Sequence, residues 1–157
     1  FDRLIDWFCK LQSNVNLLIV GDGADEEKLN HQIRTLNKTE RIKIIGFQEN
    51  PFSLVKKASA VVLASRWEGL PNIGLEALAL GKPVIASLEC GGLVELAEEF
   101  SVKNLQIVET GVEFSGAVET VIDGDASRDF SVLAEPKLPS KYEIKNVMRQ
   151  YTKIIYG

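Results

Sequence analysis

Residues 65–87 read SRWEGLPNIGLEALALGKPVIAS, and this stretch is the strongest indication of the fold. One apolar run, over 60–64, precedes it, and a second, over 83–86, lies near its end. Between the two runs, a Gly-Leu-Pro-Asn turn opens a helical pattern. Strand, turn, helix and strand in this order predict two parallel strands joined by a helix. Glu68 is then expected at the carboxyl end of the first strand and Glu76 in the first turn of the helix, where open α/β sheets bind their ligands.

Strand and helix patterns alternate along the rest of the chain. Short apolar runs closed by glycine or turn residues indicate strands, and apolar residues three or four positions apart indicate helices. Strands are predicted at 16–20, 41–45, 60–64, 83–86 and 105–108, and helices at 1–12, 25–37, 52–59, 73–80, 91–100, 114–122 and 142–156, with 123–138 irregular. The alternation predicts an α/β fold of Rossmann-like type, with a doubly wound, mostly parallel sheet and helices on both faces.

The chain opens on a helical pattern that has no strand before it. Its core-facing stripe is formed by Phe1, Leu4, Ile5, Phe8 and Leu11. Because a helix of this fold packs on a sheet, we expect that the first strand of the domain is missing. We therefore interpret the chain as part of a longer polypeptide.

The composition suits one soluble domain and argues against several classes of function. The chain has 157 residues, of which 45% are hydrophobic and 25% charged, and its net charge is −4. Nucleic-acid binders need a basic surface, so this acidic balance and the scattered lysines and arginines argue against one. Cys9, Cys90 and His31 show no metal-ligand spacing, so no zinc site is expected. No apolar run approaches the ~20 residues that span a bilayer, and no signal peptide is visible.

The segment between the two glutamates has the parts of an anion and polyol site. The helix start at 72–74 offers free backbone N–H groups to a phosphate, and Gly69 and Gly74 allow a ligand close to the backbone. Glu76 can accept two hydrogen bonds from a ribose diol, so a nucleotide-sugar would suit these groups. A structural interpretation remains open, because glutamates near a helix start also stabilise the helix dipole and Pro-Asn is a common helix opening.

A family resemblance bears on that choice. The segment EGLPNIGLEALALGKPVIAS resembles the E-x7-E signature of family 4 retaining glycosyltransferases, which have the two-lobed GT-B fold. LLIVGDGADEEKL, RIKIIGF, the later Gly-Gly and SKYEIKNVMRQYTKIIY are also similar, and the likeness is weakest over about 101–138. The resemblance implies that residues 1–157 form the carboxyl-terminal lobe, which binds the nucleotide-sugar donor. The amino-terminal, acceptor-binding lobe would be absent from this chain.

The resemblance also implies roles for individual residues. Glu68 would be the catalytic residue, which contacts the donor sugar and balances charge at the reacting carbon, and Glu76 would bind the ribose hydroxyls. The rest of the implied donor-binding set is Gly69, Leu70, Pro71, Asn72 and Ile73 beside the sugar and β-phosphate, Phe47 and Gln48 beside the base, and Gly21 and Gly23 at the border of the cleft. The family's strand-Gly-Gly-x-x-Glu pattern is partly kept as Gly91, Gly92 and Glu95.

One departure from the family limits what the isolated chain is expected to do. In the family, a basic pair just upstream of the helix that begins here at Phe1 neutralises the donor phosphates, and that pair is absent. The cations for the donor are therefore expected on the missing segment, with no metal and no other cofactor. We expect the isolated chain to be inactive in transfer and to bind nucleotide weakly.

The expected function is sugar transfer from a nucleoside-diphosphate sugar to a glycan, lipid or other acceptor, in polysaccharide or glycolipid biosynthesis. The expected partners are the donor and the amino-terminal lobe of the same polypeptide, and no nucleic acid. The expected location is the cytoplasm. The longer polypeptide could also lie at the inner face of the membrane. Two alternatives remain, a lobe of a nucleotide-sugar epimerase and a non-catalytic nucleotide-binding module.

Several other residues allow two interpretations each. Arg66 would contact either a phosphate or a surface carboxylate, and Trp67 would either shield the cleft or pack in the core. Cys90 would be reactive if exposed. His31 lies mid-helix among polar residues and is expected to be exposed. The Asp-Gly-Asp sequence at 123–125 is interpreted as a surface turn in preference to a metal-ligand set.

The Gly-Asp-Gly sequence at 21–23 does not complete a dinucleotide-binding fingerprint. The third glycine of that motif would fall at Glu26, so the motif fails. A turn between a strand and a helix explains the two glycines better.

Overall fold

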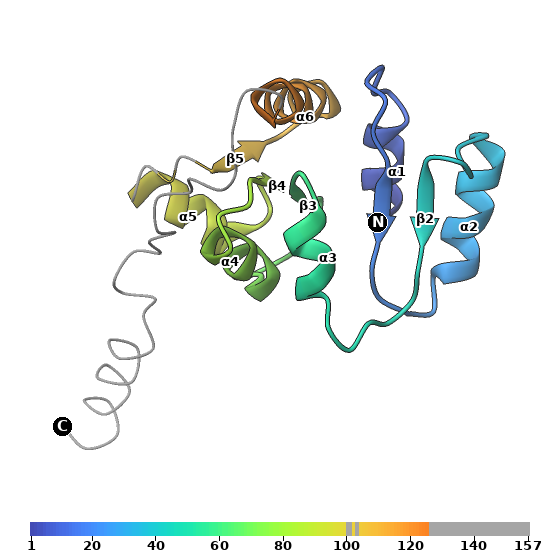
Figure 1. Cartoon of the computed structure of the whole chain (residues 1–157), viewed down its shortest axis with the longest axis horizontal. Coiled ribbons are helices and arrows are strands. Elements are labelled where there is room, and N and C mark those ends of the chain that lie inside the picture. Colours follow the sequence, from blue (N-terminus) through green and yellow to red (C-terminus); the bar gives the residue numbers. More distant parts are fainter. Residues whose placement is uncertain (100–101, 103, 126–157) are drawn as a thin grey trace.

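Helices and strands alternate along the part of the chain that this computed structural model describes, which is residues 1–99, 102 and 104–125 (Figure 1). The strands are β1 (Leu17–Ile19), β2 (Ile42–Ile44), β3 (Val61–Leu63), β4 (Val84–Ser87) and β5 (Leu105–Val108). The helices are α1 (Asp2–Phe8), α2 (Glu26–Thr35), α3 (Phe52–Lys57), α4 (Asn72–Ala79), α5 (Gly91–Glu99) and α6 (Gly111–Asp125). Every strand and helix predicted before residue 126 is confirmed, and the predicted helix 142–156 lies outside the described residues.

α1 and α6 differ most from their predicted lengths. α1 ends at Phe8 instead of residue 12, because the chain tightens there and the Leu11 N–H donates to the Phe8 carbonyl at 3.1 Å. α6 begins three residues earlier than predicted and continues to Asp125. The Asp-Gly-Asp sequence at 123–125 is therefore the end of a helix and not a surface turn.

A reciprocal capping interaction explains the early start of α6. The Thr110 hydroxyl accepts a hydrogen bond from the Glu113 N–H at 3.2 Å. In return, the Glu113 carboxylate accepts from the Glu109 N–H at 2.6 Å and from the Thr110 N–H at 3.4 Å. Three backbone donors at the helix start are thus satisfied by local groups.

The strands form two parallel sheets. β1 pairs with β2, with Leu17 opposite Ile42, and β3, β4 and β5 pair in that order, with Val84 between Val61 and Leu105. The parallel pairing is as predicted. The expectation of a single sheet is not met within the described residues, because β1 and β3 are each at the edge of a different sheet and do not pair.

Helices cover both faces of the β3–β4–β5 sheet, as predicted. One apolar core joins α1, α2 and α6 to β1 and β2, and the Trp7 and Phe114 rings link α1 to α6 with centroids 5.7 Å apart. A second core joins α3, α4 and α5 to the other face of the β3–β4–β5 sheet. β4 is buried at every position and alternates between them, since Ile85 belongs to the first core and Val84 and Ala86 to the second.

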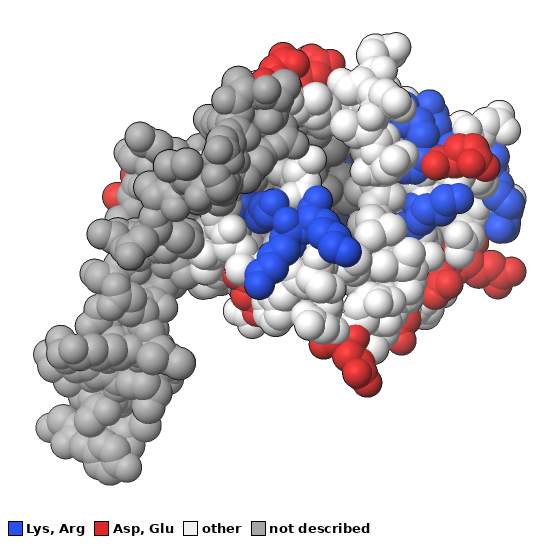
Figure 2. Space-filling model, viewed as in Figure 1, with Lys and Arg blue, Asp and Glu red and all other residues white. Residues whose placement is uncertain are grey.

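Charged side chains on the face seen in Figure 2 include both signs. Lysines and arginines lie in separate groups, and aspartates and glutamates lie near the rim of that view. No helix among the described residues is long and apolar enough to cross a membrane.

Candidate functional site

The turn that carries Glu68 is held by backbone hydrogen bonds from the loop that follows β4. The Glu68 N–H donates to the Glu89 carbonyl at 3.2 Å, and the Gly91 N–H donates to the Glu68 carbonyl at 3.2 Å. A third bond, from the Gly92 N–H to the Gly69 carbonyl, measures 2.7 Å. Because parallel strands end at the same edge of a sheet, the loops after β3 and β4 meet here.

Two glycines permit the close packing behind this turn. A Cβ atom on Gly92 would lie 2.7 Å from the Leu70 Cβ, so only glycine lets the start of α5 approach the turn. A Cβ atom on Gly74 would lie 2.8 Å from the Leu93 Cδ1. Gly74 was expected to make room for a ligand, but it is buried and makes room for the core instead. Gly69 has nothing within 4 Å of its Cβ position, and its role in ligand approach stays a prediction.

The Glu68 side chain lies in the open, at a shallow hollow. The hollow measures about 680 Å³ and is lined by Arg66, Trp67, Glu68, Gly69 and Glu89. The Glu68 carboxylate accepts a hydrogen bond of 3.2 Å from the Ser65 hydroxyl. Trp67 lines the hollow and is 88% exposed, which rules out the core-packing interpretation.

Glu76 lies on α4, close to the helix start that was predicted to bind phosphate. The helix begins at Asn72 and follows the buried Pro71, so Glu76 is in the second turn and not in the first. Asn72 is exposed and Ile73 half-buried. Glu76 is half-buried, and within the described ranges its carboxylate has no hydrogen bond or ion pair. A ligand at the helix start would therefore meet an acceptor that the protein itself leaves unused.

A second group of predicted residues meets at the ends of β1 and β2. The Gly21 N–H donates to the Gly46 carbonyl at 2.9 Å, and these residues have φ angles of 129° and 68°, which favour glycine. Phe47 is 69% exposed. The Gln48 side chain donates to the Ile45 carbonyl at 3.0 Å, within its own loop. The exposed Gly23 has a carbonyl that accepts from the Glu26 N–H at 3.1 Å, where the chain turns into α2.

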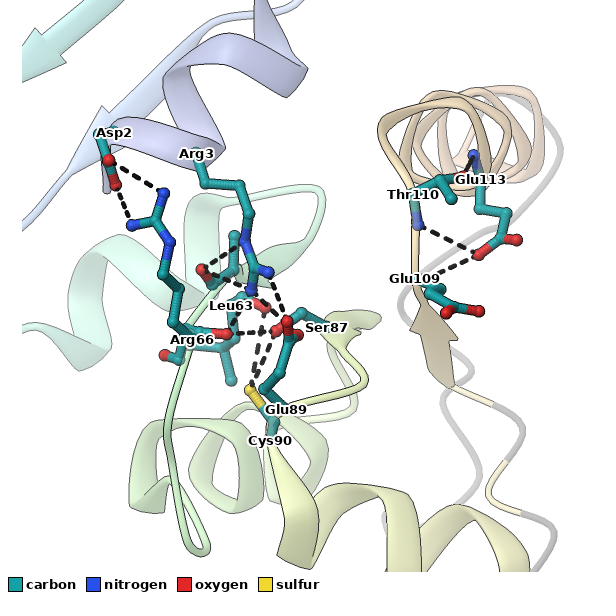
Figure 3. Close-up of polar contacts among 12 residues, drawn as sticks. Asp2, Arg3, Leu63, Arg66, Ser87, Glu89, Cys90, Glu109, Thr110 and Glu113 are labelled. Atoms are coloured by element: carbon teal, nitrogen blue, oxygen red, sulfur yellow. Dashed lines mark hydrogen bonds and ion pairs between the residues drawn. The ribbon is translucent and has the colours of Figure 1, made fainter.

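Arg3 at the start of α1 contacts both the loop after β3 and the loop after β4 (Figure 3). Its guanidinium pairs with the Glu89 carboxylate at 2.6 and 3.0 Å. It also donates to the Ala64 carbonyl at 3.1 and 3.3 Å and to the Ser65 carbonyl. The hydrogen bond from Arg3 lowers the pKa of Glu89 to about 2. Arg3 is therefore the main link between α1 and the loops around Glu68.

Asp2 extends this link in two directions. Its carboxylate pairs with Arg66 at 2.6 and 3.0 Å, so Arg66 contacts a carboxylate, one of its two predicted roles. The hydrogen bond from Arg66 holds the pKa of Asp2 well below its usual range. The Asp2 carbonyl accepts from the Gln32 side chain of α2 at 3.1 Å. Through α1, the β1–β2 half is thus joined to the loops after β3 and β4.

Ser87 was not identified from the sequence, although it supports the same turn. It is fully buried at the end of β4, and its hydroxyl donates to the Ser65 carbonyl at 2.8 Å. Cys90 is fully buried beside Ser87, so it lacks the exposure that a reactive thiol needs. A polar residue that closes a continuous apolar strand is a signal for such a buried hydrogen bond.

His31 is exposed on α2, as predicted.

The predicted site residues thus form two groups at the carboxyl ends of the strands. The first comprises Glu68–Ile73 with Glu76, and the second comprises Gly21, Gly23, Phe47 and Gln48. Among the described residues, no hydrogen bond joins the two groups directly.

A comparison with known families identifies the chain. The family model described as glycosyl transferases group 1 matches residues 1–130. The chain belongs to the group 1 glycosyltransferases. This membership confirms the expectation of a glycosyltransferase domain, and the assignment to family 4 stays a prediction.

Relatives of this group 1 chain include proteins from archaea and bacteria. It is 43% identical over 74 residues to an uncharacterized glycosyltransferase of Methanocaldococcus jannaschii. This alignment covers 47% of this chain and 18% of the relative. It is 40% identical over 88 residues to the lipopolysaccharide 1,6-galactosyltransferase of Escherichia coli. This alignment covers 54% of this chain and 24% of the relative. The chain therefore spans less than half the length of these curated relatives.

Solved structures show the same fold. Anabaena Alr3699/HepE, in a crystal structure with UDP-glucose, superposes with a TM-score of 0.79 at 24% identity, over 97% of this chain and 43% of that one. The lipopolysaccharide outer core galactosyltransferase WaaB also has a TM-score of 0.79 at 24% identity, over 98% of this chain and 44% of that one. The Rossmann-like α/β prediction, as part of a GT-B fold, is confirmed.

Proposed function

We propose that this domain is the carboxyl-terminal, donor-binding lobe of a family 4 retaining glycosyltransferase. It binds a nucleoside-diphosphate sugar at the carboxyl ends of its parallel strands. The observation that carries the proposal is the state of Glu76. The residue lies half-buried near the start of α4, and its carboxylate accepts no hydrogen bond from any described residue. A ribose diol is a ligand that such a carboxylate can hold through two hydrogen bonds.

Glu68 is the proposed catalytic residue. It lies exposed on the turn after β3, eight positions before Glu76, so the two form the E-x7-E signature. The hydrogen bond from Ser65 and the backbone bonds to the loop after β4 restrict where the carboxylate can lie. There it would contact the donor sugar and balance the positive charge that develops at the reacting carbon.

The remaining contacts to the donor would come from the two groups of site residues. The backbone from Gly69 through Leu70, Pro71, Asn72 and Ile73 would contact the sugar and the β-phosphate, because the N–H groups at the start of α4 favour an anion. Phe47 and Gln48 would contact the base, and Gly21 and Gly23 would border the cleft. UDP is the first nucleotide to test, since the solved relative with this fold holds UDP-glucose.

The acceptor side belongs to the rest of the proposed enzyme. An amino-terminal lobe of the same polypeptide would bind the acceptor and close over the donor. A glycolipid or lipopolysaccharide acceptor is supported by the E. coli relative, which is a lipopolysaccharide galactosyltransferase. We place the protein in the cytoplasm, at the inner face of the membrane if its acceptor is lipid-linked.

The proposal includes no protein-bound metal. No group of three or more His, Cys, Asp and Glu side chains that could hold an ion occurs within the described ranges. Nucleotide affinity that is unchanged by a chelator would agree with this part of the proposal. A loss of affinity that added Mg²⁺ restores would contradict it.

The epimerase alternative gains no support from the described residues. The fold can serve such enzymes with histidines in the cleft, but His31 is the only histidine and lies exposed on α2, outside the hollow at Glu68. The non-catalytic alternative differs from a transferase only in the reaction, so a transfer assay on the full protein separates the two.

A matched pair of variants tests the donor role of Glu76. Glu76→Ala is expected to weaken UDP binding about 10- to 150-fold, the equivalent of roughly 1.5–3 kcal/mol for hydrogen bonds to a charged group. Glu98→Ala, which removes an exposed carboxylate of α5, serves as the control and should leave binding unchanged. Isothermal titration calorimetry of both variants and of the unaltered chain gives the comparison. Equal affinities for all three would contradict the assignment.

A further inference from the structure

Two arginines lie beside the loops that carry Glu68, and their guanidinium groups are held differently (Figure 3). The Arg3 group pairs with Glu89 and also donates to two backbone carbonyls, and its side chain is 16% exposed. The Arg66 group pairs with Asp2 alone among the described residues, and its side chain is 47% exposed. Arg3 is therefore fixed by the protein, whereas Arg66 depends on one exposed contact.

Arg66 lines the hollow at the turn that carries Glu68, together with Gly69. The backbone of Gly69 belongs to the segment that would contact the sugar and the β-phosphate of the donor. A guanidinium binds a phosphate with the same planar pair of N–H donors that it uses for a carboxylate. A suitable cation thus lies within the same hollow as part of the proposed donor contacts.

The charges around this hollow oppose an anion as long as Arg66 stays with Asp2. The charged groups are the guanidiniums of Arg3 and Arg66 and the carboxylates of Asp2, Glu68 and Glu89. Arg3 offsets Glu89 and Arg66 offsets Asp2, so the negative charge of Glu68 is left without an opposite charge. A diphosphate brings further negative charge into this group. Binding is therefore most favourable if Arg66 turns from Asp2 to the phosphate.

The exchange of partners requires little rearrangement. Water screens both charges of an exposed ion pair, so the Asp2–Arg66 contact contributes little to stability. The backbone around Arg66 stays in place, because the N–H and the carbonyl of Glu68 are both bonded to the loop that follows β4. Arg3 keeps its own bonds to both loops. The Arg66 side chain can therefore rotate while the start of α1 remains attached to the loops.

We propose that Arg66 binds the diphosphate of the donor and that Asp2 competes with the diphosphate for Arg66. In the free domain Asp2 holds the guanidinium, and a bound nucleoside diphosphate displaces Asp2 from it. This inference rests on the proposed function, because it concerns the same donor site. In a different arrangement, Arg66 stays on Asp2, and Asp2 opposes the anion only through its charge. The two arrangements predict different effects for variants of Asp2.

Four forms of the chain measure the coupling between the two residues. They are the unaltered chain, Asp2→Asn, Arg66→Ala and the double variant, and Arg34→Ala removes an exposed cation of α2 as a control. Each form is titrated by NMR with UDP and with inorganic pyrophosphate, to millimolar concentration at low salt. Pyrophosphate carries two phosphates without the base and the ribose, so it tests the anion contact alone. Glu76→Ala is titrated with UDP beside these forms.

The two single variants are expected to change affinity in opposite directions. Arg66→Ala should weaken the binding of both probes about 10-fold, because the phosphates lose a charged donor. Asp2→Asn should tighten both about fivefold, because Arg66 no longer has a charged partner in the free domain. In the Arg66→Ala background, the change at Asp2 should alter affinity less than about twofold, since the residue for which Asp2 competes is gone. Arg34→Ala should leave both affinities unchanged.

An Asp2→Asn effect that is equal or larger in the Arg66→Ala background would overturn the proposal, because Asp2 would then act through repulsion alone. Affinities that do not depend on Arg66 would also overturn it. If Glu76→Ala weakens UDP binding and Arg66→Ala does not, only this inference fails and the proposed donor site stands. If pyrophosphate binding depends on Arg66 but UDP does not bind, the anion contact is supported and the proposed function is contradicted. No binding of either probe would overturn both.

Discussion

Arg3 and Glu89 form a two-pronged ion pair, with Nη1–Oε1 at 2.6 Å and Nη2–Oε2 at 3.0 Å, between the start of α1 and the loop that follows β4. The same guanidinium donates to the carbonyls of Ala64 and Ser65, which precede the Glu68 turn. One side chain thus connects a helix of the first core to two loops that carry the candidate site.

Loss of the Arg3 guanidinium should destabilise the domain. Arg3→Ala is expected to lower the free energy of unfolding by about 1–3 kcal/mol, because two half-buried carbonyls and a carboxylate lose a charged donor. Arg3→Lys should recover only part of this, since an ammonium cannot reproduce the planar fork. Arg34→Ala, at an exposed position of α2, is the control. Urea unfolding that is equal for Arg3→Ala and Arg34→Ala would contradict the role given to Arg3.

The contribution of Glu89 should depend on pH in one direction. Its pKa is lowered to about 2 from an ordinary value near 4.5, because Arg3 donates to the ionised form. A depressed pKa contributes stability above the ordinary value, and this stability is lost as the pH falls through the lowered one. The difference between the unaltered chain and Glu89→Gln should therefore be full at pH 6 and shrink between about pH 4.5 and 2. We expect it to be under about 1 kcal/mol, because the pair is partly exposed. A difference that grows with acid would be inconsistent with the ion pair.

Gly92 and Gly69 provide a matched pair of substitutions. Gly92→Ala should destabilise the domain by about 1–3 kcal/mol, because its methyl group would lie 2.7 Å from the Leu70 Cβ. It should also weaken nucleotide binding by displacing the Glu68 turn. Gly69→Ala adds the same atom where nothing lies within 4 Å and should leave stability nearly unchanged. Thermal unfolding of both variants provides the check, and a reversed order would show that the packing is described wrongly.

The cap of α6 should contribute a measurable amount to stability. Thr110→Ala removes the hydroxyl that accepts from the Glu113 N–H and should cost about 0.5–2 kcal/mol. Thr110→Ser keeps the hydroxyl and should retain most of the stability. Denaturant midpoints of the two variants test this, and a serine variant as unstable as the alanine variant would point away from capping.

The order of helices and strands could be predicted because each element has a local signal. The apolar run over 105–108 became β5 with the same bounds, and the helix predicted from residue 52 begins there as α3. The Thr110-x-x-Glu113 pattern is also a local signal, because a capping pair of this spacing places the start of α6 at residue 111. Local patterns therefore account for nearly all of the elements.

The parts of the site that could not be predicted depend on contacts between distant residues. Arg3 lies 86 positions from Glu89, and nothing near either residue indicates the pair. Gly74 was expected to make room for a ligand. The residue that occupies this space is Leu93 of another helix, and the sequence around Gly74 does not indicate that contact. The separation into two sheets likewise depends on which strand lies beside which, and apolar runs carry no information about their neighbours.

The central claim, that this domain binds a nucleotide-sugar donor, is tested most directly by an NMR titration of the chain with UDP, GDP and ADP without metal. The account predicts saturable shifts for one of the three nucleotides at both groups of site residues, near Gln48 and near Glu76. Affinity is expected to be weak, so each nucleotide should be followed to millimolar concentration. Shifts confined to other surfaces, or no shifts at either group with any of the three, would contradict it.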